Sequence, residues 1–218
     1  MLEDRILYID AEAIVIDKPA GLPVDPPRAG GDSVVARAGG LKLGFQREPV
    51  AMHRLDRDTS GCLLLARNPK ARAKFQQAFE SGMVEKTYLA VVDGVPEGGE
   101  GLIDLPLAKV SSAADGWRMV PDDKGKSART RWRKLAVRDG QSLIVFNPLS
   151  GRTHQLRVHA ARGLGTPIVG DPVYGARSEA MLLHSWRLVV PRGAKPPIDV
   201  TAAVPDSFGL WLDCLDAA

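Results

Sequence analysis

The sequence has few cysteines and no long apolar segment. Its 218 residues include only two cysteines, Cys62 and Cys214, and these form no CxxC pair. Such a chain is not built on a disulfide framework and fits a reducing cytosol, so we expect a cytoplasmic protein. No stretch approaches the roughly 20 apolar residues that a membrane-spanning helix requires. The charged N-terminus MLEDRILYID does not look like a secretion signal, and no association with membranes is expected.

Internal repeats and low-complexity linkers are also absent, so we expect a single domain over residues 1–218. Short apolar runs, mostly separated by Gly and Pro, predict strands at 6–9, 14–16, 62–66, 88–92, 143–146, 182–183 with 188–190, and 200–204. Helices are predicted after the N-cap Asn68, ending near Gly82, and at 154–162, 33–38 and 207–214. Many strands with few helices, and no regular βαβ rhythm, favour an α+β fold.

Positive charge is concentrated in one part of the chain. The net charge is +3, and because residues 195–218 carry −3, residues 1–194 carry +6. Seven cations and no acid lie between Lys124 and Arg138. Such a local field attracts polyanions such as nucleic acid. A solvated surface strand would have the same composition, so this segment alone leaves both interpretations open.

The segment HRLDRDTSG at 53–61 leads directly into the apolar run 62–66. A carboxylate such as Asp56 can be held there at the edge of the core, where neighbouring charges act strongly on it. The alternative is a purely structural turn. In that case Asp58, Thr59 and Ser60 bond to local backbone while an arginine makes an ordinary ion pair.

A second polar segment spans 147–159. With Thr153 as N-cap, His154 and Arg157 would share a helix face, and Arg152 would lie where an anion can bind. Zinc binding by His154 and His159 is disfavoured, because five residues separate them and no cysteine partners exist, so no metal is expected. Tyr88, in the alternating segment 85–94, is either a core residue or a ring that stacks on a base.

Together these segments resemble the RluA family of RNA pseudouridine synthases. The motifs that carry the resemblance follow one another along nearly the whole chain: KPAGLPV within 17–24, HRLDRDTSG at 53–61, EKTYLAVVDG at 85–94, GRTHQLRVH at 151–159, TPIVGDPVYG at 166–175 and LLHS at 182–185. The resemblance implies isomerisation of uridine to pseudouridine in RNA, without metal or organic cofactor. It also implies a bent mixed, largely antiparallel sheet with flanking helices and a central RNA-binding cleft.

Several residue roles follow from the resemblance. Asp56 is the expected nucleophile, which attacks either uracil C6 or ribose C1′. Tyr88 would stack on the target base, Arg157 would pair with Asp56, and Arg54 would help to hold the flipped nucleotide. Further RNA contacts are expected from His53, Arg152, His154, Arg129 and Arg131.

We expect no S4-type RNA-binding domain, because the chain is short and is similar to the subgroup named after RluA itself. That similarity implies stem-loop substrates in 23S rRNA, tRNA or both, and we expect a monomer. Two rival interpretations stay open at this point. One is a glycoside hydrolase that uses Asp56 and Asp58 as acid and base. The other is an RNA-binding protein that has lost its activity.

Overall fold

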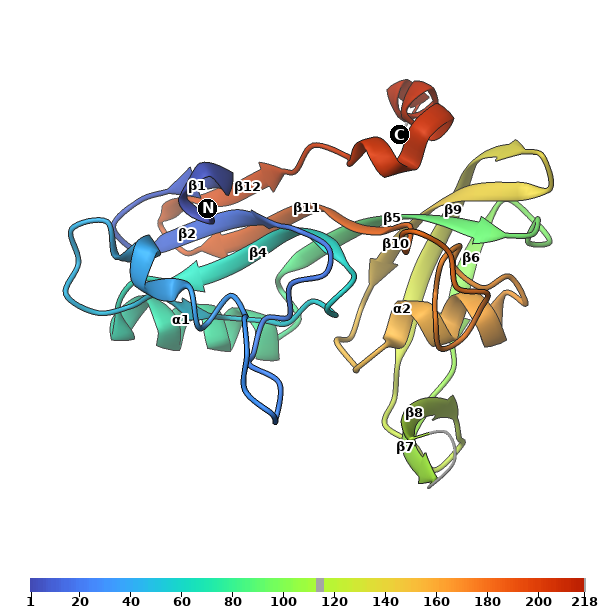
Figure 1. The fold of residues 1–218 in the computed structure, drawn as a ribbon, viewed down its shortest axis with the longest axis horizontal. Coiled ribbons are helices and arrows are strands. Elements are labelled where there is room, and N and C mark those ends of the chain that lie inside the picture. The colour runs from blue at the N-terminus through green and yellow to red at the C-terminus, as the bar shows by residue number, and fades with distance from the viewer. Residues whose placement is uncertain (113–115, 218) are drawn as a thin grey trace. The chain divides into compact units, whose positions relative to one another are not determined.

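The structure, a computed structural model, describes residues 1–112 and 116–217. The chain forms two compact units. Unit 1 comprises Met1–Lys86 and His184–Val204, and unit 2 comprises Thr87–Leu183 and Pro205–Ala218. Each unit is described by itself below (Figure 1). A single domain over the whole chain stays a prediction.

Unit 1 is built on a mostly antiparallel set of strands. In spatial order these are β1 (Ile6–Ile9), β2 (Ala13–Lys18), β4 (Ser60–Ala66), β11 (Leu183–Arg192) and β12 (Lys195–Thr201), and β3 (Val50–Ala51) pairs with β4. Only the β4–β11 pair is parallel, and it spans just two residue pairs. All seven residues of β4 are buried. This explains why β4 is apolar along its length instead of alternating.

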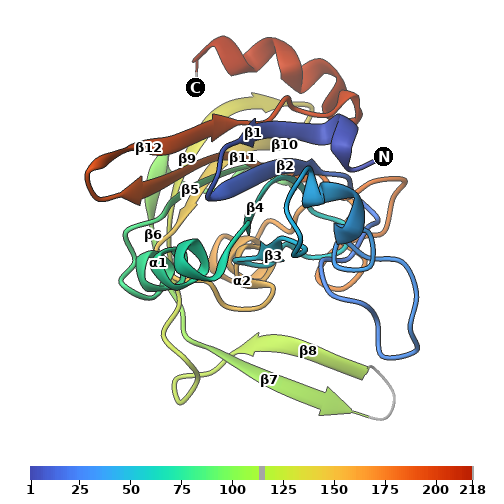
Figure 2. The same cartoon turned by 90° about the vertical axis from the view of Figure 1, so that its left-hand side faces the viewer.

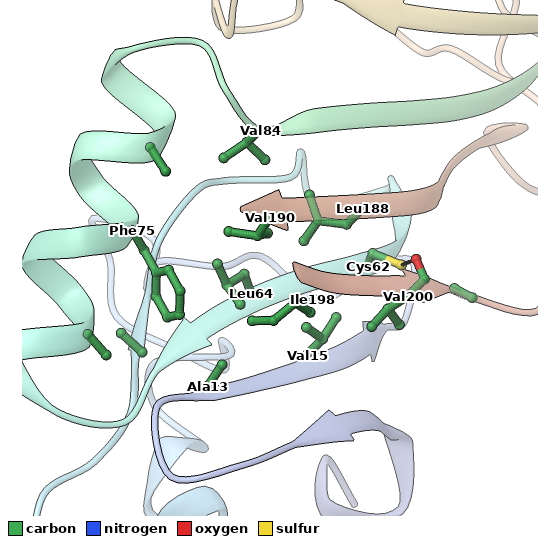
Figure 3. Close-up of a cluster of buried hydrophobic side chains, with 14 residues drawn as sticks. Ala13, Val15, Cys62, Leu64, Phe75, Val84, Leu188, Val190, Ile198 and Val200 are labelled. Atoms are coloured by element: carbon green, nitrogen blue, oxygen red, sulfur yellow. Dashed lines mark hydrogen bonds between the residues drawn. The ribbon is translucent and has the colours of Figure 1, made fainter. Parts of the chain in front are cut away.

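Helix α1 (Pro69–Glu80) covers one side of these strands. It begins where the sequence predicts, with the Asn68 side chain accepting a hydrogen bond from the Ala71 N–H at 2.9 Å. Phe75 is buried in an apolar cluster with side chains of β2, β4, β11 and β12 (Figure 3). The helix ends at Glu80 with Ser81 as its C-cap, and Met83, which follows it, is 53% exposed.

A glycine makes the short parallel contact between β4 and β11 possible. Gly61 has φ +104°, and a Cβ atom added there would lie 2.2 Å from the carbonyl oxygen of Ser185. A side chain at this position would therefore force the two strands apart. Next to it, the buried hydroxyl of Ser60 and Nδ1 of His184 are 2.8 Å apart.

Unit 2 contains four antiparallel strands in the order β5 (Glu85–Asp93), β10 (Gln141–Pro148), β9 (Arg129–Arg138) and β6 (Glu100–Asp104). A separate two-stranded hairpin is formed by β7 (Leu107–Ser112) and β8 (Gly116–Pro121). In both views this hairpin projects away from the four strands of unit 2 (Figure 1, Figure 2). The sequence did not predict it.

The helical segments of unit 2 are short. Helix α2 (Gln155–Val158) continues into a π-helix at His159–Gly163, and a 3₁₀ segment at Asp206–Ala217 closes the chain. The predicted regular helix over 154–162 is therefore corrected to two helical types. Its N-cap is His154, with a left-handed φ of +53°, and not Thr153. Its end near Gly163 is confirmed.

The remaining predictions were mixed. Every predicted strand run overlaps an observed strand, but two bounds differ: β11 begins at Leu183, one residue after the predicted start at 182, and β12 ends at Thr201, before the predicted end at 204. The helix predicted at 33–38 is wrong: turns occupy 34–37, and a 3₁₀ helix follows at Ala38–Lys42. The α+β class is confirmed, because largely antiparallel strands combine with few helices. Among the described residues, no helix is long and apolar enough to cross a membrane.

Candidate active site

Asp56 lies on the turn between β3 and β4 of unit 1, and its side chain is half-buried. The turn is fixed from both sides. Leu55 and Thr59 are buried, and the Thr59 N–H donates to the Asp56 carbonyl at 3.1 Å. The turn thus holds a carboxylate at the edge of the core, as the sequence predicted.

A buried lysine lies beneath this turn. The Lys18 side chain is fully buried, and its ammonium donates to the carbonyls of Pro19 at 2.8 Å, Leu22 at 2.7 Å and Arg57 at 3.0 Å. These bonds join the 17–24 segment to the 53–61 turn. Sequence analysis quoted Lys18 in a motif but gave it no role.

The burial of Lys18 changes its titration. Desolvation lowers the pKa of the ammonium from 10.5 to about 8, although the carboxylates of Asp58, Asp56 and Asp17 act in the opposite direction. Burial disfavours the charged form of Lys18. Three carbonyl dipoles and the acids of the same turn partly offset this cost. Any substrate or nucleophile chemistry at Asp56 takes place beside this fixed positive charge.

The arginines of the turn form surface ion pairs. The Arg57 guanidinium donates two hydrogen bonds, of 3.0 and 3.2 Å, to the Asp58 carboxylate. The Arg54 guanidinium lies 3.4 Å from the Asp25 carboxylate, and both side chains are exposed. Exposed pairs of this kind contribute little to stability. The turn therefore contains the ordinary ion pairs that its structural interpretation predicts, and these pairs leave a functional role for Asp56 open.

His53, which was expected to contact RNA, has structural contacts. Its Nε2 accepts a hydrogen bond from the Leu64 N–H at 3.0 Å, and its ring stacks on Phe79 at 5.2 Å. Desolvation, helped by the nearby Lys86 charge, lowers the pKa of His53 to about 3. A neutral ring with one nitrogen engaged by backbone is suited to holding the turn. Its contact with RNA stays a prediction.

In unit 2, Tyr88 sits on β5 opposite Phe146 of β10 and is 8% exposed. The end of β10 is tied to the same strand by Asn147, whose side-chain amide donates to the Thr87 hydroxyl at 3.0 Å. Most of the Tyr88 ring is therefore packed by protein. A stacking role would use the remaining exposed part of the ring.

Arg157 is held rigidly within unit 2. Its guanidinium donates two hydrogen bonds of 2.7 Å to Asp171, and both side chains are buried. Burial by itself would raise the pKa of Asp171, but Arg157 and the backbone N–H groups of Val173 and Tyr174 outweigh it, so this pKa is lowered. No sequence pattern had indicated Asp171 as the partner of Arg157. A guanidinium has five N–H donors, so this bond does not exclude a second carboxylate, and pairing with Asp56 stays a prediction.

His154 and Arg157 do share a neighbour, although not through regular helix geometry. Nδ1 of His154 is 2.9 Å from the Tyr174 hydroxyl, and the Arg157 guanidinium lies 5.2 Å from the centre of the Tyr174 ring. On its other side, His154 packs on Trp117 of β8 at 4.9 Å. The sequence gave no signal for Tyr174 beyond its place in a quoted motif.

Gln155 connects the loop over 149–154 to β9. The side-chain oxygen of this buried residue accepts from the Ser150 hydroxyl at 2.7 Å and the Arg152 N–H at 3.0 Å. Its amide nitrogen donates to the Arg129 carbonyl and the Thr130 hydroxyl, both at 3.0 Å. Two of the arginines predicted to contact RNA, Arg129 and Arg152, are therefore positioned through their backbone by the Gln155 side chain. Both arginine side chains are exposed.

The basic segment 124–138 is a strand only from Arg129 onward. Arg129, Arg131 and Arg133 are exposed, while Thr130 and Trp132 are buried, so the arginines share the solvent-facing side of β9.

The arginines of β9 do not all have the same surroundings. The register places each of them opposite a residue of β6: Arg129 opposite Asp104, Arg131 opposite Leu102, and Arg133 opposite Glu100. The Arg129 guanidinium lies 3.4 Å from the Asp104 carboxylate. The structure thus places acids of β6 beside a segment that contains none. Of these three arginines, Arg131 is the one whose β6 neighbour is apolar.

Comparison with known proteins shows the family to which this sequence belongs. The model of the RNA pseudouridylate synthase family matches residues 12–162, a range that includes Asp56, Tyr88 and Arg157. The chain belongs to the RNA pseudouridylate synthase family. It is 55% identical over 212 residues to an uncharacterized RNA pseudouridine synthase of Zymomonas mobilis, which covers 95% of this chain and 97% of the relative.

Two further relatives agree. The ribosomal large subunit pseudouridine synthase D of the same organism is 36% identical over 183 residues, with 81% of this chain and 57% of that protein covered. The structure of human RNA pseudouridylate synthase domain containing 4 superposes with a TM-score of 0.81 at 26% identity, covering 99% and 94% of the two chains. The resemblance read from the motifs is confirmed. So is the expected class of enzyme, an isomerase that converts uridine to pseudouridine in RNA.

Proposed function

We propose that the chain isomerises uridines in structured stem-loop RNA, in 23S rRNA, tRNA or both, with the Asp56 carboxylate as nucleophile. The observation that carries the proposal is the 53–61 motif, whose aspartate sits on a turn held by the buried Lys18 within the family match. In this proposal the protein acts as a monomer in the cytoplasm.

The reaction explains why a carboxylate is needed. The bond between N1 of uracil and C1′ of ribose must break, the base must rotate, and C5 must then bond to the same C1′. A water nucleophile would release the base, whereas a covalent link through Asp56, to C6 or to C1′, keeps base and sugar together. The target uridine must leave its stack to be reached.

The other predicted residues act around Asp56 in this proposal. Arg157, aligned by Asp171, keeps the nucleophile ionised, and Tyr88 stacks on the uracil. The remaining predicted residues hold the RNA, largely through phosphates: Arg54, His53, Arg152, His154, Arg129 and Arg131.

Tritium release from RNA labelled at uracil C5 tests the proposal, because C5 loses its hydrogen only when it becomes the glycosidic carbon. Transcripts of 23S rRNA and tRNA are offered separately. We expect Asp56→Ala to abolish release while RNA affinity stays within a few-fold of the wild type. Asp58→Asn, on the same turn, is the matched control and should retain release.

Each alternative outcome has a defined meaning. Release by Asp56→Ala would refute the nucleophile assignment. Free uracil as product, with loss of activity in Asp58→Asn, would favour the glycoside hydrolase. Wild-type binding of both RNA classes without any release would favour a binding protein.

A further inference from the structure

Trp117 is a large aromatic side chain on the surface of the β7–β8 hairpin. It is 45% exposed, whereas Trp132 and Trp211 are each 7% exposed. The exposed part of this indole is an aromatic surface on which a planar ligand can stack.

The orientation of the Trp117 ring is fixed from behind. The imidazole of His154 packs on it with a centroid separation of 4.9 Å and an interplanar angle of 33°. The Tyr174 hydroxyl accepts a hydrogen bond from the Met119 N–H at 2.9 Å, so its own hydrogen is available for Nδ1 of His154, also at 2.9 Å. Indole, imidazole and phenol thus form one contiguous aromatic cluster, in which the imidazole and the phenol meet edge to face, and this cluster needs little ordering when a ligand binds.

Positive charge lies close to the exposed ring. The Lys109 ammonium lies over the indole, 4.8 Å from its centre, so a base that stacks on this face takes the place of a flexible lysine side chain. Beside Tyr174 there is a pocket of about 210 Å³, lined by Arg118, Met119, Val120, Pro121, Arg162, Val173 and Tyr174. Two of these lining residues are cations and none is an acid, so the pocket suits an anion.

We infer that the hairpin carries a nucleotide-binding subsite, in which Trp117 stacks on an unpaired base and the Arg118–Arg162 pocket receives a neighbouring phosphate. An aromatic face together with adjacent cations is the combination that single-stranded nucleic acid recognises. Apolar peptides would gain nothing from the two arginines. The inference rests on the proposed function in taking the ligand to be RNA, and it adds a contact outside the catalytic residues.

A uridine-free decamer of adenosine and cytidine, labelled with fluorescein, tests the stacking without any chemistry. We expect Trp117→Ala to weaken binding about 5- to 100-fold in fluorescence anisotropy, the usual range for loss of one stacked base. Trp117→Phe should retain part of the affinity, because it keeps an aromatic face. Leu210→Ala, at another exposed apolar side chain of unit 2, is the control and should bind like the wild type.

Equal affinity of Trp117→Ala and the wild type would overturn the stacking role, provided that circular dichroism shows both folded. For the pocket, the double variant Arg118→Ala/Arg162→Ala should lower the slope of log affinity against log salt by about 1, as expected for one lost phosphate contact. An unchanged slope would overturn the phosphate site.

Tritium release separates this inference from the proposed function. If the wild type releases tritium but binds the decamer no better than Trp117→Ala, the enzyme assignment stands and the subsite is wrong. If the wild type releases none while Trp117→Ala loses decamer binding, the subsite stands and the proposed activity is wrong.

Discussion

Replacing Lys18 with methionine tests how the turn that carries Asp56 is held. Methionine fills a similar volume but leaves the carbonyls of Pro19, Leu22 and Arg57 without their shared donor. Hydrogen bonds from a charged donor are worth about 1.5–3 kcal/mol each. Against this, the fall of the Lys18 pKa from 10.5 to about 8 corresponds to roughly 3 kcal/mol of unfavourable burial. The difference between the three bonds and this cost leads us to expect that Lys18→Met lowers the free energy of unfolding by about 1.5–6 kcal/mol.

Urea denaturation followed by circular dichroism measures this change, with Lys70→Met as the control. Lys70 is an exposed lysine on α1, and its replacement should alter stability by less than about 0.5 kcal/mol. Because the turn positions Asp56, the proposed nucleophile, kcat of Lys18→Met should fall about 10- to 100-fold with KM little changed. A variant as stable and as active as the wild type would refute the role given to Lys18.

The same residue predicts a pH dependence. Because the pKa of Lys18 is lower in the folded protein than in the unfolded chain, the unfolded chain binds more protons between about pH 8 and 10.5. Wild-type stability should therefore rise relative to Lys18→Met across this window. A difference between the two proteins that is constant with pH would contradict the burial of a titrating ammonium.

Three further predictions concern other parts of the site. Arg157→Lys loses the paired hydrogen bonds to the buried Asp171 carboxylate. It should lower the free energy of unfolding by about 2–4 kcal/mol and also lower kcat, and an unchanged melting temperature would be inconsistent with the buried pair. His53→Gln removes a group whose folded pKa is about 3. Wild-type stability should fall as pH drops from about 6.5 towards 4 by roughly 1–2 kcal/mol more than that of the variant in urea titrations, and equal slopes would contradict this. Arg131→Glu should weaken RNA binding and flatten its salt dependence more than Arg133→Glu, which lies opposite Glu100; equal effects in filter binding would refute the register argument.

The sequence predicted those parts of the fold that follow from local patterns. The Asn68–Pro69 start of α1 and the apolar run of β4 are local signals, and both were confirmed. Cys62 belongs to this apolar run, and its thiol is fully buried with a pKa raised by desolvation to about 12. The β7–β8 hairpin was missed because most of its residues are exposed and show no regular alternation of apolar and polar residues.

The side chains and carbonyls that contact the site residues could not be predicted from the sequence. Asp171 is 14 residues from Arg157, and no periodic pattern links the two. Lysine is almost never fully buried, so composition assigns Lys18 to the surface. Only the folded chain shows that three carbonyls from two separate motifs converge on its ammonium. Motif order therefore identified the family, while the contacts that position Asp56 required the structure.

The close approach at Gly61 affects how a mutational scan of the 53–61 motif should be interpreted. Any substitution there places atoms where the Ser185 carbonyl already lies, so selection against all nineteen alternatives would come from strand separation. In a survival screen, position 61 would be as intolerant as Asp56, yet for a different reason. Soluble yield distinguishes the two, because Gly61 variants should be lost before they reach RNA, whereas Asp56 variants should accumulate as folded but inactive protein. An invariant column in such a motif is therefore not by itself a sign of chemistry.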